Sequence, residues 1–256
     1  MPRTVLITGS TSGIGLGIAN GFAAKGYQVM LNGLEDNGAE IAQNMAEKYQ
    51  VKTSFSKANL LDKSAIEGLI QHTLEQFGSL DVLINNAGIQ HVSPIESFDS
   101  NKYEQIIALN MNAAFYAAKA VWNHMKHQQF GRIITISSVH GLRASEFKVA
   151  YVAAKHGVIG MTKVLALEGA PYNINANAIC PGYVKTPLVE NQIKDQAEAH
   201  HMSETDVVQK VMLKKQAVKE FVPISLIAET ALLLAGELSA TITGTTVALD
   251  GGWSAQ

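Results

Sequence analysis

The sequence predicts an α/β fold built on a doubly wound, seven-stranded parallel sheet. Short apolar runs alternate with longer segments whose apolar residues recur at helical spacing. The apolar runs contain few polar residues, which is typical of parallel strands covered on both faces. Right-handed crossovers between such strands place helices on both sides of the sheet. We therefore expect one layered domain over residues 1–256.

The predicted elements follow this alternation along the chain. The expected strands are Thr4–Thr8, Gln28–Asn32, Lys52–Lys57, Asp81–Asn85, Arg132–Ser137, Ile174–Cys180 and Thr245–Leu249. The expected helices are Gly13–Lys25, Asp36–Lys48, Lys63–Phe77, Asn101–Lys126 and Val149–Glu168. The stretch Thr186–Phe221, between strands six and seven, is long, polar and mostly helix-forming. We interpret it as a helical lid over a substrate site, although a surface helix pair without a role is the alternative.

Composition excludes several classes of protein. The net charge is -2 and no basic block stands out, which argues against a nucleic-acid partner. Cys180 is the single cysteine, so an internal disulfide is excluded and a reducing, cytoplasmic location is expected. The sequence has no signal-peptide pattern and no apolar run long enough to span a membrane. The pair His200-His201 lacks further ligands at zinc-like spacing, so no metal site is expected.

A glycine-rich loop joins the first predicted strand to the first predicted helix. Glycines allow close approach of the backbone to a pyrophosphate, and the N–H groups of the helix start face its charge. The spacing Gly-x-x-x-Gly-x-Gly differs from the common dinucleotide fingerprint, and a plain tight turn is the alternative. A second motif ends the fourth strand, where small residues leave room for a ribose and nicotinamide. The candidate cofactor residues are Gly9, Thr11, Ser12, Gly13, Ile14, Gly15, Asn86, Ala87 and Gly88.

Four residues are candidates for catalysis. Tyr151 and Lys155 lie four residues apart in a predicted helix, so they share one face. A cationic Lys155 would favour the phenolate and lower the pKa of Tyr151 from about 10, towards a value useful for acid–base chemistry. Ser138 ends the fifth strand, where its hydroxyl can point into the same crevice. Asn110 lies within a predicted helix, where an amide is mildly unfavourable.

Together these motifs resemble the short-chain dehydrogenase/reductase family in order and spacing, over essentially the whole chain. The resemblance implies a Rossmann-type fold and a nicotinamide cofactor. It implies that Tyr151 is the general acid/base and that Ser138 orients the substrate oxygen. It also implies that Lys155 binds the nicotinamide ribose and tunes the tyrosine, and that Asn110 holds a water in a proton relay. Further cofactor contacts that it implies are Asn59, Leu60, Pro181, Gly182 and Val184.

The end of the second strand bears on the choice between NAD and NADP. Relatives that use NAD often have an acid there to bind the ribose hydroxyls, and Gly33 takes that place in this chain. Relatives that use NADP usually place Arg or Lys there or in the glycine loop. Ser10, Thr11 and Leu34 are uncharged, so we predict NAD. Asn32 or backbone groups are expected to contact the ribose and Leu34 to flank the adenine, with a plain loop residue as the alternative for Leu34.

Polar side chains suited to a carboxylate gather around the predicted crevice. The candidate substrate residues are Gln90, Ser138, His140, Lys148, Tyr151, Gln192 and Trp253. Amide, imidazole and ammonium donors compensate the desolvation of a carboxylate. The set resembles the pocket of the D-3-hydroxybutyrate dehydrogenases within the same family. That resemblance implies reversible, NAD-linked oxidation of D-3-hydroxybutyrate to acetoacetate by a homotetramer, with the long helices and C-terminal segment at its interfaces. Taken singly, each residue is equally consistent with surface exposure or packing.

Other functions stay open at this point. A 3-oxoacyl thioester reductase or a sugar dehydrogenase of the same family would need no carboxylate-binding residues, and carrier-protein reductases usually use NADP. A non-catalytic NAD-binding module would not need the four candidate catalytic residues. Nothing in the sequence favours a purely structural protein. A measurement of catalytic turnover distinguishes an enzyme from a non-catalytic NAD-binding module and from a structural protein.

Overall fold

The computed structural model describes residues 2–186, 189, 193, 197 and 202–256. In this part of the chain one sheet has seven parallel strands, in the order β3-β2-β1-β4-β5-β6-β7. Its strands are β1 (Thr4–Ile7), β2 (Gln28–Asn32), β3 (Thr53–Ser56), β4 (Val82–Asn85), β5 (Gly131–Ile136), β6 (Ile174–Pro181) and β7 (Thr246–Leu249). The order reverses between β1 and β4, and the crevice at this reversal is where doubly wound folds bind ligands. The predicted fold class is confirmed.

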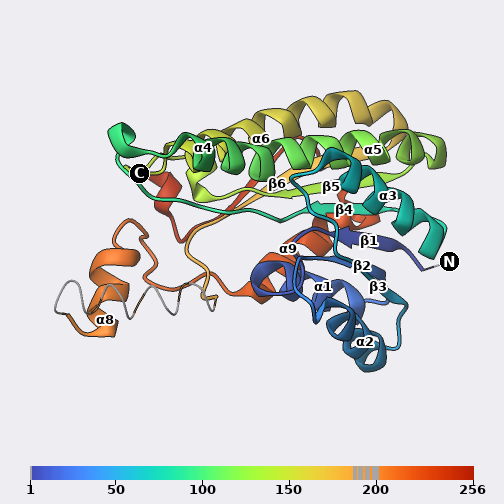
Figure 1. Ribbon diagram of the computed structural model, residues 1–256, viewed down its shortest axis with the longest axis horizontal. Helices are drawn as coiled ribbons and strands as arrows, with labels where there is room; N and C mark the ends of the chain where they lie inside the picture. The colour runs from blue at the N-terminus through green and yellow to red at the C-terminus, as the bar shows by residue number, and fades with distance from the viewer. Residues whose placement is uncertain (1, 187–188, 190–192, 194–196, 198–201) are drawn as a thin grey trace.

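Helices cover both faces of the sheet. They are α1 (Gly13–Ala24), α2 (Gly38–Tyr49), α3 (Lys63–Phe77), α4 (Ser100–Ile107), α5 (Ala113–Gln128), α6 (Val149–Gly169) and α9 (Ile224–Ala235). The short helix α8 (Glu204–Asp206) lies apart from the sheet (Figure 1). Figure 1 shows α3, α4, α5 and α6 on one side of the sheet and α1, α2 and α9 on the other. The strands between the two layers are buried along their whole length, whereas the edge strands β3 and β7 are partly exposed. Burial on both faces explains why the inner strands are so apolar.

Local sequence signals fix several helix ends. Asp62 accepts a hydrogen bond from the N–H of Ser64 at the start of α3, and Gly78 ends that helix in the left-handed conformation. Asp99 accepts bonds from the first turn of α4 in the same way. By contrast, Ser12 precedes α1 without a side-chain bond to it, and the first turn of α1 has no acidic residue. The N–H groups at the start of α1 therefore stay available to an external anion.

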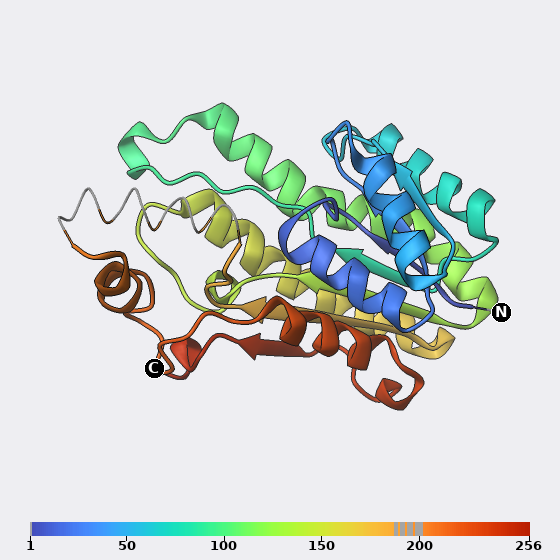
Figure 2. The same cartoon turned by 90° about the horizontal axis from the view of Figure 1, so that it is seen from below.

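Two features of the fold differ from the prediction. The expected helix Asn101–Lys126 is divided by η2 (Ala108–Asn112), a π-helical turn between α4 and α5. Helix α9 was not predicted, because its sequence is apolar almost throughout and gives no clear helical periodicity. Figures 1 and 2 show α9 beside α1, and Gly17 of α1 lets Ile224 approach closely. No helix in the described ranges is long and apolar enough to cross a membrane.

Candidate active site

The glycine loop and the loop after β4 are tied together by hydrogen bonds. The Thr8 hydroxyl accepts from the N–H groups of Asn86 at 3.0 Å and Ala87 at 3.1 Å. The Asn86 amide donates in return to the carbonyls of Thr8 at 2.9 Å and Gly9 at 2.8 Å. A Cβ at Gly15 would lie only 2.2 Å from the Gly9 carbonyl oxygen, so this close packing requires glycine. These contacts hold the open start of α1 at the carboxyl end of β1, where a pyrophosphate can bind.

Asn32 has a structural role at the end of β2. Its amide nitrogen donates to the carbonyls of Ser56 at 3.1 Å and Ala58 at 3.0 Å. Its amide oxygen accepts from the N–H of Gly9 at 3.3 Å. Both amide donors are therefore used, and Asn32 has none left for a ribose hydroxyl. The side chain of Asn32 thus joins β2, β3 and the glycine loop, which favours backbone groups for the expected ribose contact.

An acidic residue does lie beside the glycine loop, but it is Glu35. The hydroxyl of Thr11 donates to the Glu35 carboxylate, and this bond lowers the pKa of Glu35. A Cβ added at Gly33 would lie 2.5 Å from both Glu35 Oε2 and Thr11 Oγ1. The Glu35 carboxylate thus occupies the space into which a side chain at position 33 would point. The ribose-binding acid was sought at position 33 only, whereas the nearest acidic residue in the chain, Glu35, is two residues further on. Leu34, between them, is 59% exposed.

The remaining predicted cofactor residues lie along the carboxyl edge of the sheet. Pro181 ends β6, and Gly182 and Val184 follow it at that edge. Leu60 is 8% exposed and lines a small cavity with Asn85 and Ile136, the last residues of β4 and β5, whereas Asn59 is exposed. This distribution matches a ligand that extends along the strand ends, as dinucleotides do in doubly wound folds.

Three candidate catalytic residues come from two neighbouring elements. Tyr151 and Lys155 lie on α6, with the Lys155 nitrogen 5.6 Å from the centre of the tyrosine ring. Ser138 follows β5, and a hydrogen bond between its side chain and Tyr151 lowers the pKa of the phenol. Burial acts more strongly and raises the pKa of Tyr151 overall. The pKa of Tyr151 is therefore raised and not lowered as expected, while Lys155 is itself buried and donates to the Ile136 carbonyl at 2.8 Å.

The charge of Lys155 should make the stability of the protein depend on pH. Burial lowers the pKa of Lys155 from 10.5 to about 8, so the unfolded chain binds this proton more tightly. The free energy of unfolding should therefore rise between these two pH values, by about 3 kcal/mol at most from this group. In Lys155→Met that increment should disappear. Thermal unfolding across pH 7 to 11 measures it, with Lys163→Met, an exposed lysine of the same helix, as the control. An identical pH dependence in Lys155→Met and the wild type would contradict the assignment.

Asn110 lies in the π-helical turn η2 and is 3% exposed. Its amide oxygen accepts from the N–H of Ile89 at 2.8 Å, and its amide nitrogen donates to the Ile89 carbonyl at 2.9 Å. This pair of bonds fixes the loop after β4 against the helical layer. Asn110 therefore lies in a widened turn and not in a regular helix, where an asparagine is unfavourable. Such π-helical turns occur frequently at functional sites.

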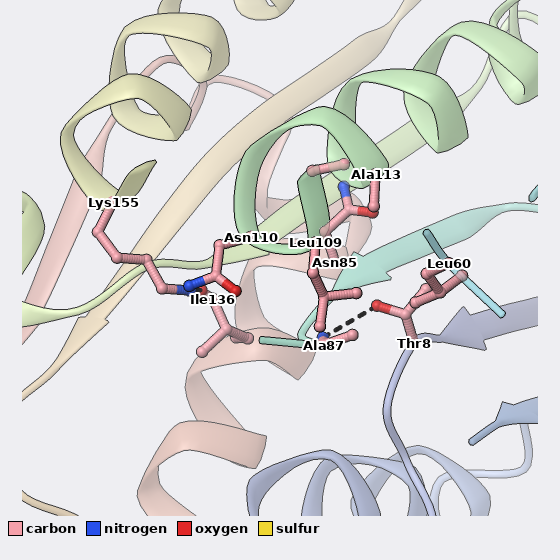
Figure 3. Close-up of a pocket in the computed structure, with 10 residues that line it drawn as sticks. Thr8, Leu60, Asn85, Ala87, Leu109, Asn110, Ala113, Ile136 and Lys155 are labelled. Atoms are coloured by element: carbon pink, nitrogen blue, oxygen red, sulfur yellow. Dashed lines mark hydrogen bonds between the residues drawn. The ribbon is translucent and has the colours of Figure 1, made fainter. Parts of the chain in front are cut away.

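Asn110 and Lys155 line a small cavity together with residues of the sheet, as Figure 3 shows. Its volume is about 10 Å³, about the room that one water molecule needs. The amide nitrogen of Asn85 also faces this cavity and is a buried donor without a partner in the described ranges. Buried donors are normally satisfied, so a single water here would complete the hydrogen bonding of Asn85.

Three of the predicted substrate residues meet beside the catalytic group. The His140 ring lies 5.9 Å from that of Tyr151 and 5.3 Å from that of Trp253, which is 6% exposed. The Ser138 hydroxyl accepts from the N–H of His140 at 3.1 Å. Burial, and then the charge of Lys148, lowers the pKa of His140 to about 4. The imidazole is therefore neutral near pH 7 and acts through one N–H donor and one acceptor.

Lys148 and Gln90 belong to two loops that are joined by a backbone hydrogen bond. Lys148 immediately precedes α6 and is half-buried, and burial lowers its pKa. The N–H of Ser93 donates to the Phe147 carbonyl at 2.9 Å, which holds the loop of Gln90 beside Lys148. The Gln90 side chain is exposed. The third predicted amide, Gln192, lies outside the described residues, as do His200 and His201.

Two pocket residues were missed by sequence reasoning. The ring of Tyr183 is stacked on that of Trp253 at 6.0 Å. The Lys215 nitrogen lies 5.5 Å from the centre of the Trp253 ring and donates to the Ser145 hydroxyl at 3.3 Å. Both follow β6 along the chain and reach the pocket through tertiary packing, for which the local sequence has no signal. Among the described residues, no group of acidic, histidine or cysteine side chains is arranged to hold a metal ion.

Comparisons with known proteins identify the family of this chain. Residues 3–197 match the family model described as short chain dehydrogenase. The chain is 45% identical to the D-beta-hydroxybutyrate dehydrogenase of Rhizobium meliloti, and the alignment covers 100% of both chains. It is 41% identical to the enzyme of the same name from Cupriavidus necator, over 99% of this chain and 98% of that one. The crystal structure of an actinorhodin polyketide ketoreductase with NADPH superposes with a TM-score of 0.92 at 28% identity, covering 100% of this chain and 98% of that chain. This chain belongs to the short-chain dehydrogenase family, whose members are oxidoreductases that bind a nicotinamide cofactor.

Proposed function

We propose that this oxidoreductase catalyses the reversible oxidation of D-3-hydroxybutyrate to acetoacetate with NAD. The observation that carries the proposal is the half-buried Lys148, whose charge acts on the neutral His140, which in turn packs against the buried Trp253. An ammonium without an ion pair in the described ranges favours an anionic substrate, because burying an unpaired charge is unfavourable. The two full-length relatives with this activity in their names support the same substrate.

The residues present suit a nicotinamide dinucleotide. The open start of α1 supplies N–H donors for the pyrophosphate, and Lys155 has donors left for the nicotinamide ribose. The Glu35 carboxylate beside Thr11 would accept from the hydroxyls of the adenine ribose and would repel a 2′-phosphate. When bound, the cofactor supplies the acceptor for a hydride from C3 of the substrate. These features favour NAD over NADP.

Different residues of the pocket bind the substrate and transfer its proton. Lys148 and His140 bind the carboxylate, Gln90 and Gln192 are assigned to it as further amide donors, and Trp253 closes the apolar side. Ser138 holds the substrate hydroxyl, and Tyr151 as phenolate accepts its proton. Because burial raises the pKa of Tyr151, the cation of Lys155 must offset that effect once both groups meet the ribose.

The proton leaves the site through a buried path. From Tyr151 it would pass by way of Lys155, which would also hold the nicotinamide ribose, to a water in the cavity beside Asn110. The one-water volume of that cavity and the unpartnered Asn85 donor support this path. In the reverse reaction the same groups deliver a proton to the oxygen of acetoacetate.

The proposal includes a lid formed by residues 186–221, part of which lies outside the described residues, and a homotetrameric assembly. Closure of the segment 186–221 would exclude water from the hydride path. Exposed apolar side chains on the long helices, Phe115 on α5 and Leu167 on α6, support a homotetramer assembled through these faces. The single buried thiol of Cys180 is consistent with a cytoplasmic enzyme.

Glu35 should set the preference for NAD. In Glu35→Gln, loss of a charge-assisted hydrogen bond should raise the KM for NAD roughly tenfold, and turnover with NADP should become detectable. Initial rates at varied NAD and NADP measure both effects. Glu40→Gln, an exposed acid of the neighbouring helix α2, is the control and should leave both cofactors unaffected. An unchanged NAD to NADP preference in Glu35→Gln would rule out this role.

The proposed reaction is tested by the initial rate of NADH formation from D-3-hydroxybutyrate and NAD. Parallel reactions use the L-enantiomer, NADP, a 3-oxoacyl thioester with NADPH, and a set of sugars. Turnover confined to the D-acid with NAD supports the proposal. Activity on thioesters or sugars in its place would keep the Tyr151 chemistry and discard the substrate.

A further inference from the structure

A second lysine, Lys215, lies at the mouth of the pocket and has no role in the proposed function so far. Its nitrogen donates to the Ser145 hydroxyl at 3.3 Å, and that hydroxyl lies 3.1 Å from His140 Nε2. The same nitrogen lies 5.5 Å from the centre of the Trp253 ring. Lys215 therefore approaches the two residues that line the proposed substrate site, His140 and Trp253, although its own side chain is exposed.

The backbone that carries Lys215 is firmly held. The neighbouring Gln216 is 1% exposed, and its amide oxygen accepts from the N–H of Tyr183 at 3.1 Å. Its amide nitrogen donates to the carbonyl of Glu220 at 2.9 Å. The side chain of Gln256 donates to the Lys215 carbonyl at 2.7 Å. Because these bonds fix the main chain, the lysine is directed to the pocket from a set position.

The two lysines concentrate positive charge on one small pocket. The charge of Lys215 contributes to lowering the pKa of both Lys148 and His140, after the larger effect of burial, so the three groups interact. Neither lysine makes an ion pair with any residue in the described ranges. With His140 neutral, Lys148 and Lys215 bring two positive charges to this pocket. Such a site favours a small anion that both ammonium groups can reach.

We propose that Lys215 is a specificity-determining residue that binds the substrate carboxylate together with Lys148. This inference rests on the proposed function, because the anion is the carboxylate of the hydroxy acid. A carboxylate has two oxygens with about four acceptor positions, so it can accept from both ammonium groups and from His140 at once. Lys148 contacts it from the start of α6, and Lys215 from the segment before α9. Esters and thioesters have no negative charge at this position, so the two lysines favour the free acid over them.

The variant Lys215→Met tests the proposal through the kinetics of two matched substrates. The KM for D-3-hydroxybutyrate should rise roughly tenfold, as expected for one charge-assisted bond, while kcat changes less than about twofold. The KM for the uncharged methyl ester should stay unchanged, and Lys215→Arg should retain most of the affinity for the acid. Lys214→Met, the exposed neighbouring lysine, is the control and should behave as the wild type.

Direct anion binding separates this inference from the proposed function. In a Trp122→Phe background Trp253 is the only tryptophan, so its fluorescence can be titrated with acetate and, as the uncharged counterpart, methyl acetate. Acetate should bind more weakly to Lys215→Met, roughly tenfold, and methyl acetate should show no difference. If the wild type oxidises no hydroxy acid but this difference is found, the proposed function fails and the anion site stands.

Two results would overturn the inference. Equal acetate affinity in Lys215→Met and the control would show that Lys215 does not contact the anion. A fall in kcat shared by the acid and its ester, with KM unchanged, would show that Lys215 acts through Ser145 on the orientation of His140.

Discussion

Replacing Tyr151 with phenylalanine should lower kcat roughly a thousandfold, because the proton of the substrate hydroxyl then has no acceptor at the reacting oxygen. The change removes one hydroxyl and keeps the ring, which packs 5.9 Å from the His140 ring. Neither the open start of α1 nor Glu35 is touched, so the affinity for NAD should stay within about twofold. Single-turnover rates and calorimetric titration with NAD measure the two quantities separately.

A second tyrosine of the pocket provides the control for this experiment. Tyr183→Phe removes a hydroxyl that has no hydrogen-bond partner in the described ranges and keeps the stacking on Trp253. Its kcat should remain within a few-fold of the wild type, by the same account of acid–base catalysis. Comparable losses in both variants, or loss of NAD binding in Tyr151→Phe, would refute the assignment of Tyr151 as the general acid/base.

The second large effect is expected from Lys148→Met, which should raise the KM for D-3-hydroxybutyrate roughly a hundredfold with little change in kcat. Lys148 is half-buried, whereas Lys215 is exposed, so its interaction with the carboxylate is less screened by water. Methionine keeps the apolar stem, which limits the structural effect of the change.

Kinetics at saturating NAD provide the measurement, and Lys163→Met, an exposed lysine on the same helix, is the matched control. The KM for the methyl ester should not respond to either substitution. An unchanged KM for the acid in Lys148→Met would remove the carboxylate contact on which the substrate assignment depends.

Most of the fold was predictable because its signals are local. The strands β1, β2 and β4 are continuous apolar runs, and the ends of α3 are marked by Asp62 and Gly78. Helix α9 escaped prediction because its exposed face also carries apolar side chains, Leu226 and Leu233, which obscure the helical periodicity. The π-turn around Asn110 also escaped, since it depends on the bonds to Ile89 in a distant loop.

The candidate site also contains residues that local sequence predicts and residues that only the tertiary structure brings to the site. Tyr151 and Lys155 share a helix, so their spacing alone predicts that they lie close together. Glu35 was missed because only the three-dimensional turn after β2 brings it beside Thr11. Lys215 was missed because its approach to Trp253 depends on hydrogen bonds between segments that are far apart in the chain. Residues whose position is set by tertiary contacts give no local pattern to detect.

The most direct test of the account follows the hydrogen on C3 of the substrate. D-3-hydroxybutyrate deuterated at C3 is incubated with NAD and the protein, and the NADH formed is examined by mass spectrometry. We predict NADH that carries one deuterium, formed together with acetoacetate. No deuterated NADH from this acid, while another alcohol transfers its hydride, would contradict the assignment of this chain as a 3-hydroxybutyrate dehydrogenase.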